Sequence, residues 1–542
     1  MSRFPDGHAV GQPLGFFALT ALAIGVAWWW LGAPVALPPS PLAAGEKLYC
    51  VSYAPFRDGQ DPLVEGTVIP AEQIDEDMAL LSRYTDCVRT YSVDDGLDHV
   101  LASARKYGLK VLHGVWVSNN PEKTRRQIAT TVALAKQFPD VIRAIVVGNE
   151  VLLRGEMSVT DLEAIIHDVK SQVVQPVTYA DVWEFWLRYA DLKNSVDFVT
   201  VHILPYWEDF PIPASQAADH VDAIRKRVAS AVPDKDIVIG EFGWPSHGRM
   251  REGALPSPSN QGRVIEDTLA LAKRENFQVN IIEAFDQPWK RWLEGSTGRY
   301  WGIFDRAASG PKFALGGAVS DHPHWLSQAL VGIVLAALTF ASAWYAGRGK
   351  NAAAQSWPRV AGLAFFASVL FGWTVEFVPI ESYSVGGWLR SIALAAVAAA
   401  APLVCAAASA AGRSLPPFTT LLGRRGDPRD PLDAALAGVF LVLVVLAVQE
   451  ALGLVFDPRY RDFPFTPLSA AVIPFLVLTV STPRRAGPRA VAETAAAAVL
   501  AACAIYIMPN ETFANWQALW FCAAILGVAL ILVRARDAPG SE

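Results

Sequence analysis

Two glutamates end apolar, β-rich runs of the chain, and their chemistry is the most informative feature of the sequence. Glu150 closes the run Val146-Val147-Gly148-Asn149-Glu150, and Glu241 closes Ile237-Val238-Ile239-Gly240-Glu241. A carboxylate at the edge of a buried core is costly unless it is paired or used. Two carboxylates facing one cleft suit glycoside hydrolysis, in which one protonates the leaving oxygen and the other attacks the sugar or activates water. The structural alternative for each glutamate is a buried salt bridge to Arg89 or Lys290.

Short β-rich runs alternate with helix-like stretches around these glutamates. Eight such units in about 250 residues predict a closed (β/α)8 TIM barrel. A doubly wound open sheet is the alternative, but the segment 54–59 after the first strand lacks the glycine pattern of a dinucleotide-binding turn. The expected strands are Leu48–Tyr53, Cys87–Tyr91, Lys110–Val117, Val141–Glu150, Pro176–Ala180, Phe198–His202, Asp236–Glu241 and Val279–Phe285.

Catalytic side chains of a barrel come from the C-terminal ends of its strands. Here these ends and the loops after them are acidic and aromatic, which suits contacts with sugar hydroxyls and ring faces. A phosphate site would need glycine-rich loops and more cations, which these ends lack. No spacing resembles a zinc site, and we expect neither a cofactor nor a metal. The expected substrate-binding residues are Tyr53, Arg89, Tyr91, Trp116, Asn149, His202, Tyr206, Trp207, Trp244, Glu283, Asp286, Trp289, Lys290 and Trp301.

Three loops are long for this fold, namely Arg57–Pro70, Ser246–Asn260 and Arg291–Arg299. Loops of this length in a compact domain are usually functional, so they are candidates for holding a second sugar chain. Trp292 and Trp301 are the candidates for stacking on that acceptor, and the alternative is that they only pack the loops.

Several ordered motifs at these strand ends resemble glycoside hydrolase family 17, a β-glucan-acting family, over roughly residues 46–313. They are Gly148-Asn149-Glu150-Val151, Gly240-Glu241-Phe242-Gly243-Trp244-Pro245, Arg89-Thr90-Tyr91, His202 with Pro205-Tyr206-Trp207-Glu208, the run Glu283–Lys290, and Tyr300-Trp301-Gly302. The resemblance implies a (β/α)8 barrel and a retaining mechanism. Phe242 is a departure, since plant members usually carry Ser or Thr there, and it affects the hydrogen bonding of the nucleophile loop.

The resemblance also implies roles for individual residues. Glu150 would be the acid/base and Glu241 the nucleophile. Asn149 would contact the sugar 2-hydroxyl. A further group, Tyr53, Arg89, His202, Glu283 and Lys290, would support the nucleophile or the subsite beside it.

The composition indicates a membrane protein with a soluble block. The 542 residues are 52% hydrophobic and only 18% charged, with a mean hydropathy of +0.27, which excludes a disordered chain, a basic nucleic-acid binder and a purely soluble enzyme. Between Ala44 and Ser320 there are 30 basic and 38 acidic residues, a net charge of −8, whereas the remainder carries +2. The acidic block is the predicted barrel.

Apolar segments long enough to span a bilayer flank this block. The candidates are 14–36, 325–346, 359–379, 388–411, 432–456, 466–481, 490–508 and 515–533, of which the sixth is short. We therefore expect a tail and anchor at 1–44, the barrel at 45–320, and a membrane domain with about seven helices at 321–542. A cleaved signal peptide is the alternative for the first span.

Cationic residues predict the orientation. If every candidate spans, Arg3, Arg348, Lys350, Arg359, Arg413, Arg424, Arg425, Arg429, Arg484, Arg485, Arg489, Arg534 and Arg536 share one side. The opposite loops carry only Arg459 and Arg461, with Arg390 at a helix edge. The positive-inside rule then puts both termini in the cytoplasm and the barrel outside. Glu376, Gln449 and Glu450 interrupt the apolar runs near helix ends, where they either face water or line a polar path.

The five cysteines are too few and too scattered for a disulfide framework. Cys405, Cys503 and Cys522 lie in apolar segments, and Cys50 and Cys87 lie on neighbouring expected strands. Buried free thiols are the simpler interpretation for all five. A disulfide between Cys50 and Cys87 is the alternative in an oxidising compartment.

A barrel with spans on both sides resembles the bacterial membrane-bound members of the family, identified as β-(1,6)-glucan synthases, including the rhizobial type that makes cyclic β-(1,3),(1,6)-glucans. The resemblance implies glucosyl transfer from a β-glucan donor to a β-glucan acceptor on the periplasmic side of the inner membrane. Membrane lipid and a glucan-polymerising synthase are the other expected partners, and nucleic acid is not. A tethered endo-β-1,3-glucanase and a non-catalytic glucan-binding or export module remain alternatives.

Overall fold

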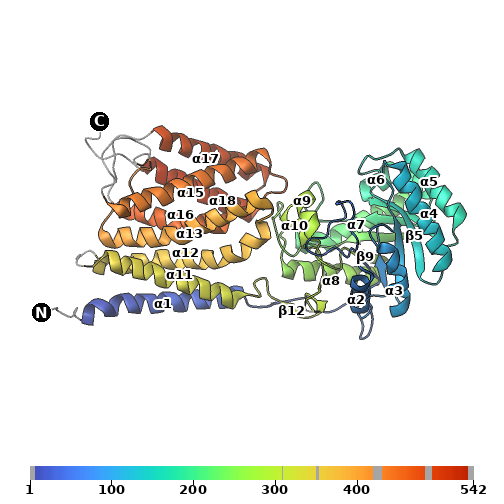
Figure 1. The fold of residues 1–542 in the computed structure, drawn as a ribbon, viewed down its shortest axis with the longest axis horizontal. Coiled ribbons are helices and arrows are strands. Elements are labelled where there is room, and N and C mark those ends of the chain that lie inside the picture. Colours follow the sequence, from blue (N-terminus) through green and yellow to red (C-terminus); the bar gives the residue numbers. More distant parts are fainter. Residues whose placement is uncertain are drawn as a thin grey trace. The chain divides into compact units, whose positions relative to one another are not determined.

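The computed structural model describes residues 7–307, 309–348, 353–418, 421, 430–482 and 491–534. The chain divides into two compact units, which we describe separately. One is the continuous segment Pro34–Val319, and the other combines Met1–Ala33 with Ser320–Glu542. Figure 1 shows strands with surrounding helices in the first unit and long helices in the second.

Eight parallel strands close into a barrel within the segment Pro34–Val319, which confirms the predicted fold class. Each strand pairs with the next along the chain, and the last, β9, pairs with the first, β2. The strands are β2 (Cys50–Ser52), β3 (Cys87–Arg89), β4 (Lys110–Val115), β5 (Ile142–Asn149), β6 (Val177–Val182), β7 (Val199–His202), β8 (Ile237–Phe242) and β9 (Gln278–Ile281). Their Val- and Ile-rich runs are nearly all buried, as expected of strands covered on both faces.

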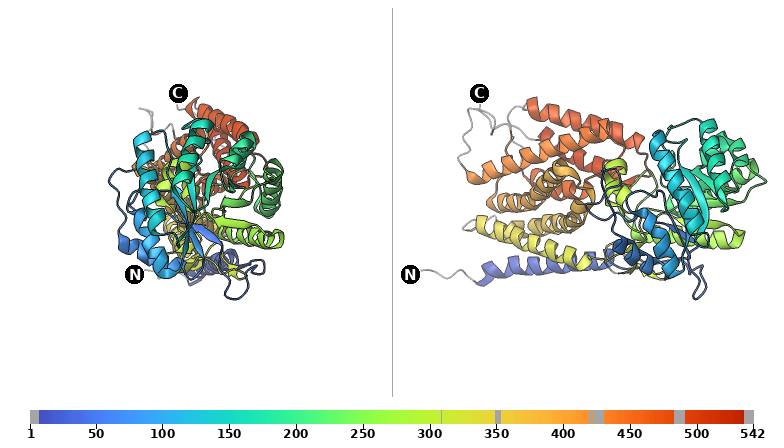
Figure 2. Two further views of the ribbon diagram at one scale, coloured as in Figure 1. Left: turned by 90° about the vertical axis from the view of Figure 1, so that its right-hand side faces the viewer. Right: turned by 45° about the vertical axis from the view of Figure 1, so that its right-hand side comes forward.

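Helices follow seven of the eight strands and cover the outside of the barrel (Figure 2). They are α2 (Ala71–Leu81), α3 (Val100–Tyr107), α4 (Pro121–Gln137), α5 (Val159–Gln172), α6 (Trp183–Arg188), α7 (Ala217–Ala231) and α8 (Pro258–Glu275). Strand β9 is instead followed by the 3₁₀ turn Pro288–Lys290 and two four-residue helices, α9 (Arg291–Glu294) and α10 (Ser296–Arg299). Eight full β-then-α units were expected, so the last one differs from the prediction.

Cys50 and Cys87 form a disulfide, so the expectation of free thiols at these two positions was wrong. Strands β2 and β3 pair with Val51 opposite Val88, which puts the two cysteines beside each other with Cα atoms 4.3 Å apart. Both belong to the small cluster of buried side chains with Leu112, Ala144 and Ala180. Neighbouring strands alone did not fix this contact, because it depends on their register.

Two short antiparallel pairs complete this unit. Strand β1 (Val35–Ala36) pairs with β12 (Ala318–Val319), and β10 (Phe304–Asp305) pairs with β11 (Gly310–Pro311). The first pair joins the two ends of the segment to each other.

All eight predicted apolar segments are helices in the second unit. They are α1 (Gly7–Leu31), α11 (Trp325–Ala346), α12 (Ala353–Glu381), α13 (Ser384–Ala411), α15 (Pro431–Phe456), α16 (Phe465–Ser481), α17 (Val491–Asn510) and α18 (Trp516–Arg534). Seven are long and apolar enough to cross a membrane, and α16 is shorter, as the sequence indicated. The chain therefore has the character of a multi-pass membrane protein. Cys405, Cys503 and Cys522 are buried free thiols here.

The orientation stays a prediction. Arg348, Arg359, Arg413 and Arg534 lie at or near helix ends. The other cationic residues expected on the same side lie outside the described residues, namely Arg3, Lys350, Arg424, Arg425, Arg429, Arg484, Arg485, Arg489 and Arg536.

Glu376 and Glu450, the two glutamates that the sequence singled out in the apolar segments, are both paired. The Glu450 carboxylate is buried and lies 2.6 Å from the Arg390 Nε, so it does not face water as one of the two sequence-based interpretations had it. Glu376 accepts a hydrogen bond from the Gln328 amide at 2.6 Å and lies 2.9 Å from the His322 Nδ1.

Candidate active site

Strand ends bring Glu150 and Glu241 together at one end of the barrel. Glu241 lies within β8, and Glu150 directly follows β5. The turn after β5 needs unusual backbone angles, with φ of 87° at Gly148 and 54° at Glu150. A non-glycine residue in this left-handed region is uncommon and is often found at functional sites. The local backbone therefore aims Glu150 into the barrel end instead of letting it continue the strand.

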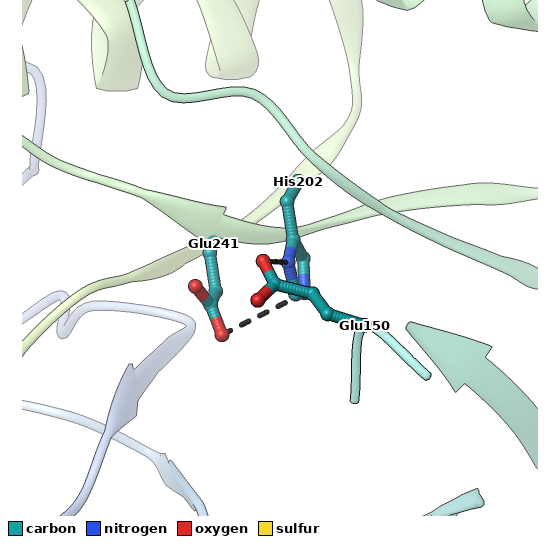
Figure 3. Close-up of side chains that lie close together, drawn as sticks. All are labelled: Glu150, His202 and Glu241. Carbon is teal, nitrogen blue, oxygen red and sulfur yellow. Dashed lines mark hydrogen bonds and ion pairs between the residues drawn. The ribbon is translucent and has the colours of Figure 1, made fainter. Parts of the chain in front are cut away.

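The two carboxylates and the His202 ring form one cluster (Figure 3). One carboxylate oxygen of Glu150, one of Glu241 and one ring nitrogen of His202 all lie within 4.8 Å of one another. His202 is opposite Glu241 in the register of β7 and β8, where the ladder shifts by one residue. This irregularity is what turns the His202 and Glu241 side chains toward the same space.

Glu241 is buried and bound by two donors. Its Oε1 accepts hydrogen bonds from the Arg89 Nη1 at 3.1 Å and from the Tyr91 hydroxyl at 2.8 Å. The Tyr91 hydroxyl lies 2.8 Å from the Ser52 Oγ, which in turn accepts from the Asn280 amide at 2.8 Å. Burial and the Glu241 charge raise the pKa of Tyr91 well above its ordinary value. Tyr91 therefore keeps its proton and donates a hydrogen bond to Glu241.

Among the residues that the structure describes, the Glu150 side chain bonds one other side chain, through the His202 Nδ1 at 3.0 Å. The other ring nitrogen, Nε2, lies 3.3 Å from the Arg89 Nη1. A guanidinium can only donate, so Nε2 must accept and the ring proton is on Nδ1, where it is donated to Glu150. Burial opposes ionisation of Glu150, but the hydrogen bond and electrostatic effect of His202, with the charges of Arg154 and Arg89, outweigh it and hold its pKa below the ordinary value.

Arg89 binds Glu241 directly and reaches Glu150 through His202. Besides Glu241 and His202, it donates to the Gly240 carbonyl at 2.6 Å and to the Asn149 Oδ1 at 2.6 Å. It is fully buried, and its guanidinium lies 4.7 Å from the centre of the Tyr91 ring. Because Asn149 gives its oxygen to Arg89, its amide NH₂ is left to donate to a ligand.

Glu150, His202 and Glu241 also have the spacing of metal ligands. However, the Arg89 Nη1 lies within 3.3 Å of His202 and within 3.1 Å of Glu241. A cation between the three would face this fixed positive charge, and the Nε2 lone pair is already used. The cluster is therefore better suited to proton transfer and nucleophilic attack than to metal binding.

Glu283 and Lys290 form a buried ion pair on the β9 side, with the Nζ 3.0 Å from a Glu283 oxygen. Burial, opposed by Lys290, raises the pKa of Glu283 to about 7. Glu294 on α9 was not predicted from the sequence. Burial raises its pKa to about 7 as well, with Lys290 lowering it and the charges of Glu150 and Glu241 raising it. A third carboxyl thus interacts electrostatically with the two candidate catalytic groups.

The predicted aromatic residues are of two kinds. Tyr206, Trp244 and Trp301 are nearly fully buried, and Tyr206 touches both tryptophans edge to face. Trp207 is half-buried and lies parallel to Trp301, with ring centres 6.3 Å apart. The more accessible rings are the half-buried Trp116 and Trp289 and the 63% exposed Trp292. The Arg154 guanidinium covers one face of the Trp116 ring, 4.5 Å from its centre.

Tyr53 and Asp286 were predicted for the site but bind residues outside the cluster of Glu150, Glu241 and His202. Tyr53 is buried, and its hydroxyl donates to Asp77 at 3.1 Å. Successive strand residues face opposite sides, and it is Ser52 that contacts Tyr91 in the barrel interior. Asp286 pairs with Lys312 at 2.7 Å and accepts from the Gly302 amide at 3.0 Å, so it holds the loop after β9.

Sequence reasoning also missed Asp181. Strand β6 runs to Val182, beyond the expected end at Ala180, and this adds the fully buried Asp181 to the strand ends. Asp181 accepts from the Tyr179 hydroxyl and from the Val182 amide, and the same Tyr179 hydroxyl accepts from the Leu152 amide at 3.0 Å. These bonds fasten the turn that carries Glu150.

Residues 50–302 match the BtgE/BtgC glycoside hydrolase domain. The match begins at the first barrel strand, includes every strand, and ends within the loop after β9. Both candidate catalytic glutamates and all the predicted substrate-binding residues fall inside it. This supports a glycoside hydrolase domain in this part of the chain.

Two curated relatives are fungal proteins with glucosidase names. The chain is 28% identical over 261 residues to the "Glucan 1,3-beta-glucosidase" of Arthroderma benhamiae, covering 44% of this chain and 82% of the relative. It is 28% identical over 265 residues to the "Probable beta-glucosidase btgE" of Aspergillus oryzae, covering 47% of this chain but only 42% of that relative.

Among solved structures, a β-1,3-glucanosyltransferase of Rhizomucor miehei in complex with laminaritriose aligns with a TM-score of 0.44 at 23% identity. That alignment covers 49% of this chain and 97% of the other.

Proposed function

We propose that this protein is a membrane-anchored, retaining β-glucan glucosyltransferase that remodels or branches β-1,3- and β-1,6-glucans. The observation that carries the proposal is the approach of Glu150 and Glu241, whose nearest oxygens lie within 4.8 Å. Retaining enzymes keep their carboxyl groups about 5–5.5 Å apart, whereas inverting enzymes need about 6.5–9.5 Å for an intervening water. The names of the curated relatives, a glucan 1,3-beta-glucosidase among them, support a β-1,3-glucan substrate.

Glu241 is the nucleophile in this proposal. Arg89 and Tyr91 donate hydrogen bonds that hold its carboxylate in place. Its oxygen attacks the anomeric carbon of the donor, and the bond from that carbon to the leaving glucan breaks. Glu150 gives its proton to the departing oxygen, which leaves a glucosyl-enzyme ester.

Glu150 then reverses its role. It takes a proton from an acceptor hydroxyl, whose oxygen attacks the anomeric carbon and releases Glu241. In the free protein His202 favours the ionised form of Glu150. A glucan bound over the pair removes water from Glu150, and this desolvation raises its pKa toward that of a general acid. The free Asn149 amide is placed to donate to the sugar 2-hydroxyl.

Transfer and hydrolysis use the same two glutamates and differ in the acceptor. An ordered glucan acceptor favours transfer by positioning, and the 63% exposed Trp292 in the loop after β9 is a candidate platform for it. The relatives named as glucosidases favour the second candidate, a tethered endo-β-1,3-glucanase.

The decisive experiment incubates the purified protein with a β-1,3-gluco-oligosaccharide and determines product lengths and linkages. Longer or 1,6-linked products are expected. Shorter reducing sugars alone would establish hydrolysis and reject transfer. No products at all, together with unchanged glucan remodelling in cells that carry Glu241→Gln, would favour the non-catalytic binding or export module.

The proposal includes a location. The catalytic barrel (45–320) lies between an anchor (1–44) and a membrane domain (321–542), on the periplasmic side of a bacterial inner membrane. The Cys50–Cys87 disulfide supports this side, because disulfides persist in oxidising compartments. Cysteine-accessibility labelling at Val174, which is 90% exposed, tests it in intact cells: a Val174→Cys variant should react with a membrane-impermeant maleimide. We propose docking of a glucan-polymerising synthase as a role for the membrane domain.

A further inference from the structure

The outside of the barrel has a gap where its eighth helix would lie. Each of β2 to β8 is followed by a helix, but β9 is followed only by a turn and two four-residue helices. In a complete (β/α)8 barrel a long helix after the last strand covers the space between its two neighbours. Here those neighbours are α8 and α2, and their facing sides need another cover.

Segments from both ends of the barrel unit fill this gap in part. On the α8 side, the Lys273 Nζ donates to the Pro41 carbonyl at 3.1 Å, and Glu266 accepts from the Gly316 amide at 2.6 Å. On the α2 side, the Lys47 Nζ donates to the carbonyl of Ser82, the residue that caps α2, at 2.6 Å. The two segments, residues 37–47 and 309–317, therefore lie across the place of the missing helix.

They do not fill it completely. A cavity of about 420 Å³ remains between them and the barrel wall. Its lining is mainly apolar and includes Leu42, Leu48, Tyr84, Ile265, Phe313 and Leu315. Leu48, Ile265 and Phe313 belong to the buried core of the barrel, and Leu42, Tyr84 and Leu315 pack against it. Water gains little in such a space, because it finds few polar partners there.

The lining of the cavity decides what it can hold. A mainly apolar wall suits a hydrocarbon chain, which loses its contact with water there. Arg83 lies at the rim, is exposed, and donates one hydrogen bond to the Ser309 carbonyl at 3.0 Å. The guanidinium has further donors, which suit a phosphate group.

The cavity is connected by short stretches of chain to helices that can cross a membrane, and membranes contain lipid acyl chains. Both segments that cover the gap continue, within about ten residues, into helices long enough to cross a membrane, α1 before them and α11 after them. A cavity walled by these segments is tethered near a bilayer by the covalent chain.

We propose that this cavity, between α8 and α2, binds one acyl chain of a membrane phospholipid, with the lipid phosphate at Arg83. The bound chain completes the outer layer of the barrel in place of its eighth helix. The site is separate from the glutamate pair, so it does not depend on the proposed reaction.

Photocrosslinking of the full-length protein tests this proposal. The protein is reconstituted into phosphatidylcholine vesicles that contain a phosphatidylcholine with a diazirine at the end of one acyl chain. After illumination, labelled peptides are mapped by mass spectrometry. We expect label on peptides from residues 40–48 and 303–315, besides the label on the spanning helices.

Two variants with the same added side chain provide the control. Ala314→Trp adds a tryptophan to an exposed residue that lines the cavity, whereas Ala307→Trp adds one to an exposed residue that does not. Ala314→Trp should lose most of the barrel label and keep the helix label, and Ala307→Trp should keep both. Barrel peptides without label in the unsubstituted protein, or an equal barrel label in both variants, would overturn the proposal. The helix label in the same sample shows that each variant is folded and inserted.

Discussion

Glu241 and Glu150 lie close together at one end of the barrel, but their surroundings differ. The Glu241 side chain is 6% exposed and takes hydrogen bonds from Arg89 and Tyr91, and behind Tyr91 stand Ser52 and Asn280. The Glu150 side chain is 23% exposed, sits on a turn with positive φ, and within the described residues has one hydrogen bond, from His202. A nucleophile must stay ionised and fixed, whereas an acid/base must gain and lose a proton. The unlike surroundings therefore support the unlike roles.

The largest effect should follow Glu241→Gln. The variant keeps the shape of the side chain but loses the attacking oxygen, so glucosyl transfer should fall by at least about 10⁴-fold. No aryl β-glucoside should restore the glucosyl-enzyme, however good its leaving group. Mass spectrometry of the protein after incubation with a 2-fluoro-glucoside measures the ester directly. A normal level of ester would remove Glu241 from its role.

Glu150→Gln should be less severe and should depend on the substrate. With a glucan donor we expect a loss of about 10²–10⁴-fold, the usual contribution of general acid–base catalysis. With an aryl β-glucoside whose leaving group needs no proton, the ester should still form, and azide should accelerate its breakdown. An identical loss with both donors would contradict the division of roles between the two glutamates.

Tyr91→Phe tests the support of Glu241 alone. Removing one hydrogen bond to a charged group should lower kcat/KM roughly tenfold to a hundredfold. Tyr107→Phe is the matched control, because its hydroxyl bonds Asp75 at 2.8 Å on the outside of the barrel. A similar loss in both variants would mean that the effect reflects general destabilisation.

The smallest effect should come from Asp181, which fastens the Glu150 turn through Tyr179. Burial raises the pKa of Asp181 to about 6 from an ordinary value of 3.8. Its protonated form stabilises the fold, so this contribution is complete below pH 3.8 and is lost as the pH rises through about 6. Melting temperatures of Asp181→Asn and of the unsubstituted protein, measured from pH 4 to 8, should differ most in their slope across this range. Parallel curves would show that Asp181 does not titrate there.

The positions of the two glutamates were predictable because parallel strands of a barrel end at the same side. Apolar runs that end in Glu150 and Glu241 had to bring them together. The apolar helices of the second unit were predictable for a similar reason, since length and hydropathy are local properties.

Properties that depend on one-residue alternation or register were not predictable. Tyr53 was expected in the site, but the alternation of β2 puts Ser52 there and Tyr53 against Asp77. The Cys50–Cys87 disulfide depends on the register of β2 with β3. Asp181 was missed because the expected strand ended one residue earlier than its own position. The absence of an eighth helix could not be predicted, because the segment after β9 is long enough to form one.

The pairing of β1 with β12 has a consequence for how this chain could be rebuilt. Val35 lies opposite Val319, and on the helical side the Ser320 Oγ donates to the Gly32 carbonyl at 2.9 Å. The barrel thus enters and leaves the helical unit at a single point, as an insertion does, and domains with adjacent ends tolerate excision and exchange. A short glycine linker from Gly32 to Ser320 should leave a free-standing helical protein, and other enzymes could be grafted at the same junction.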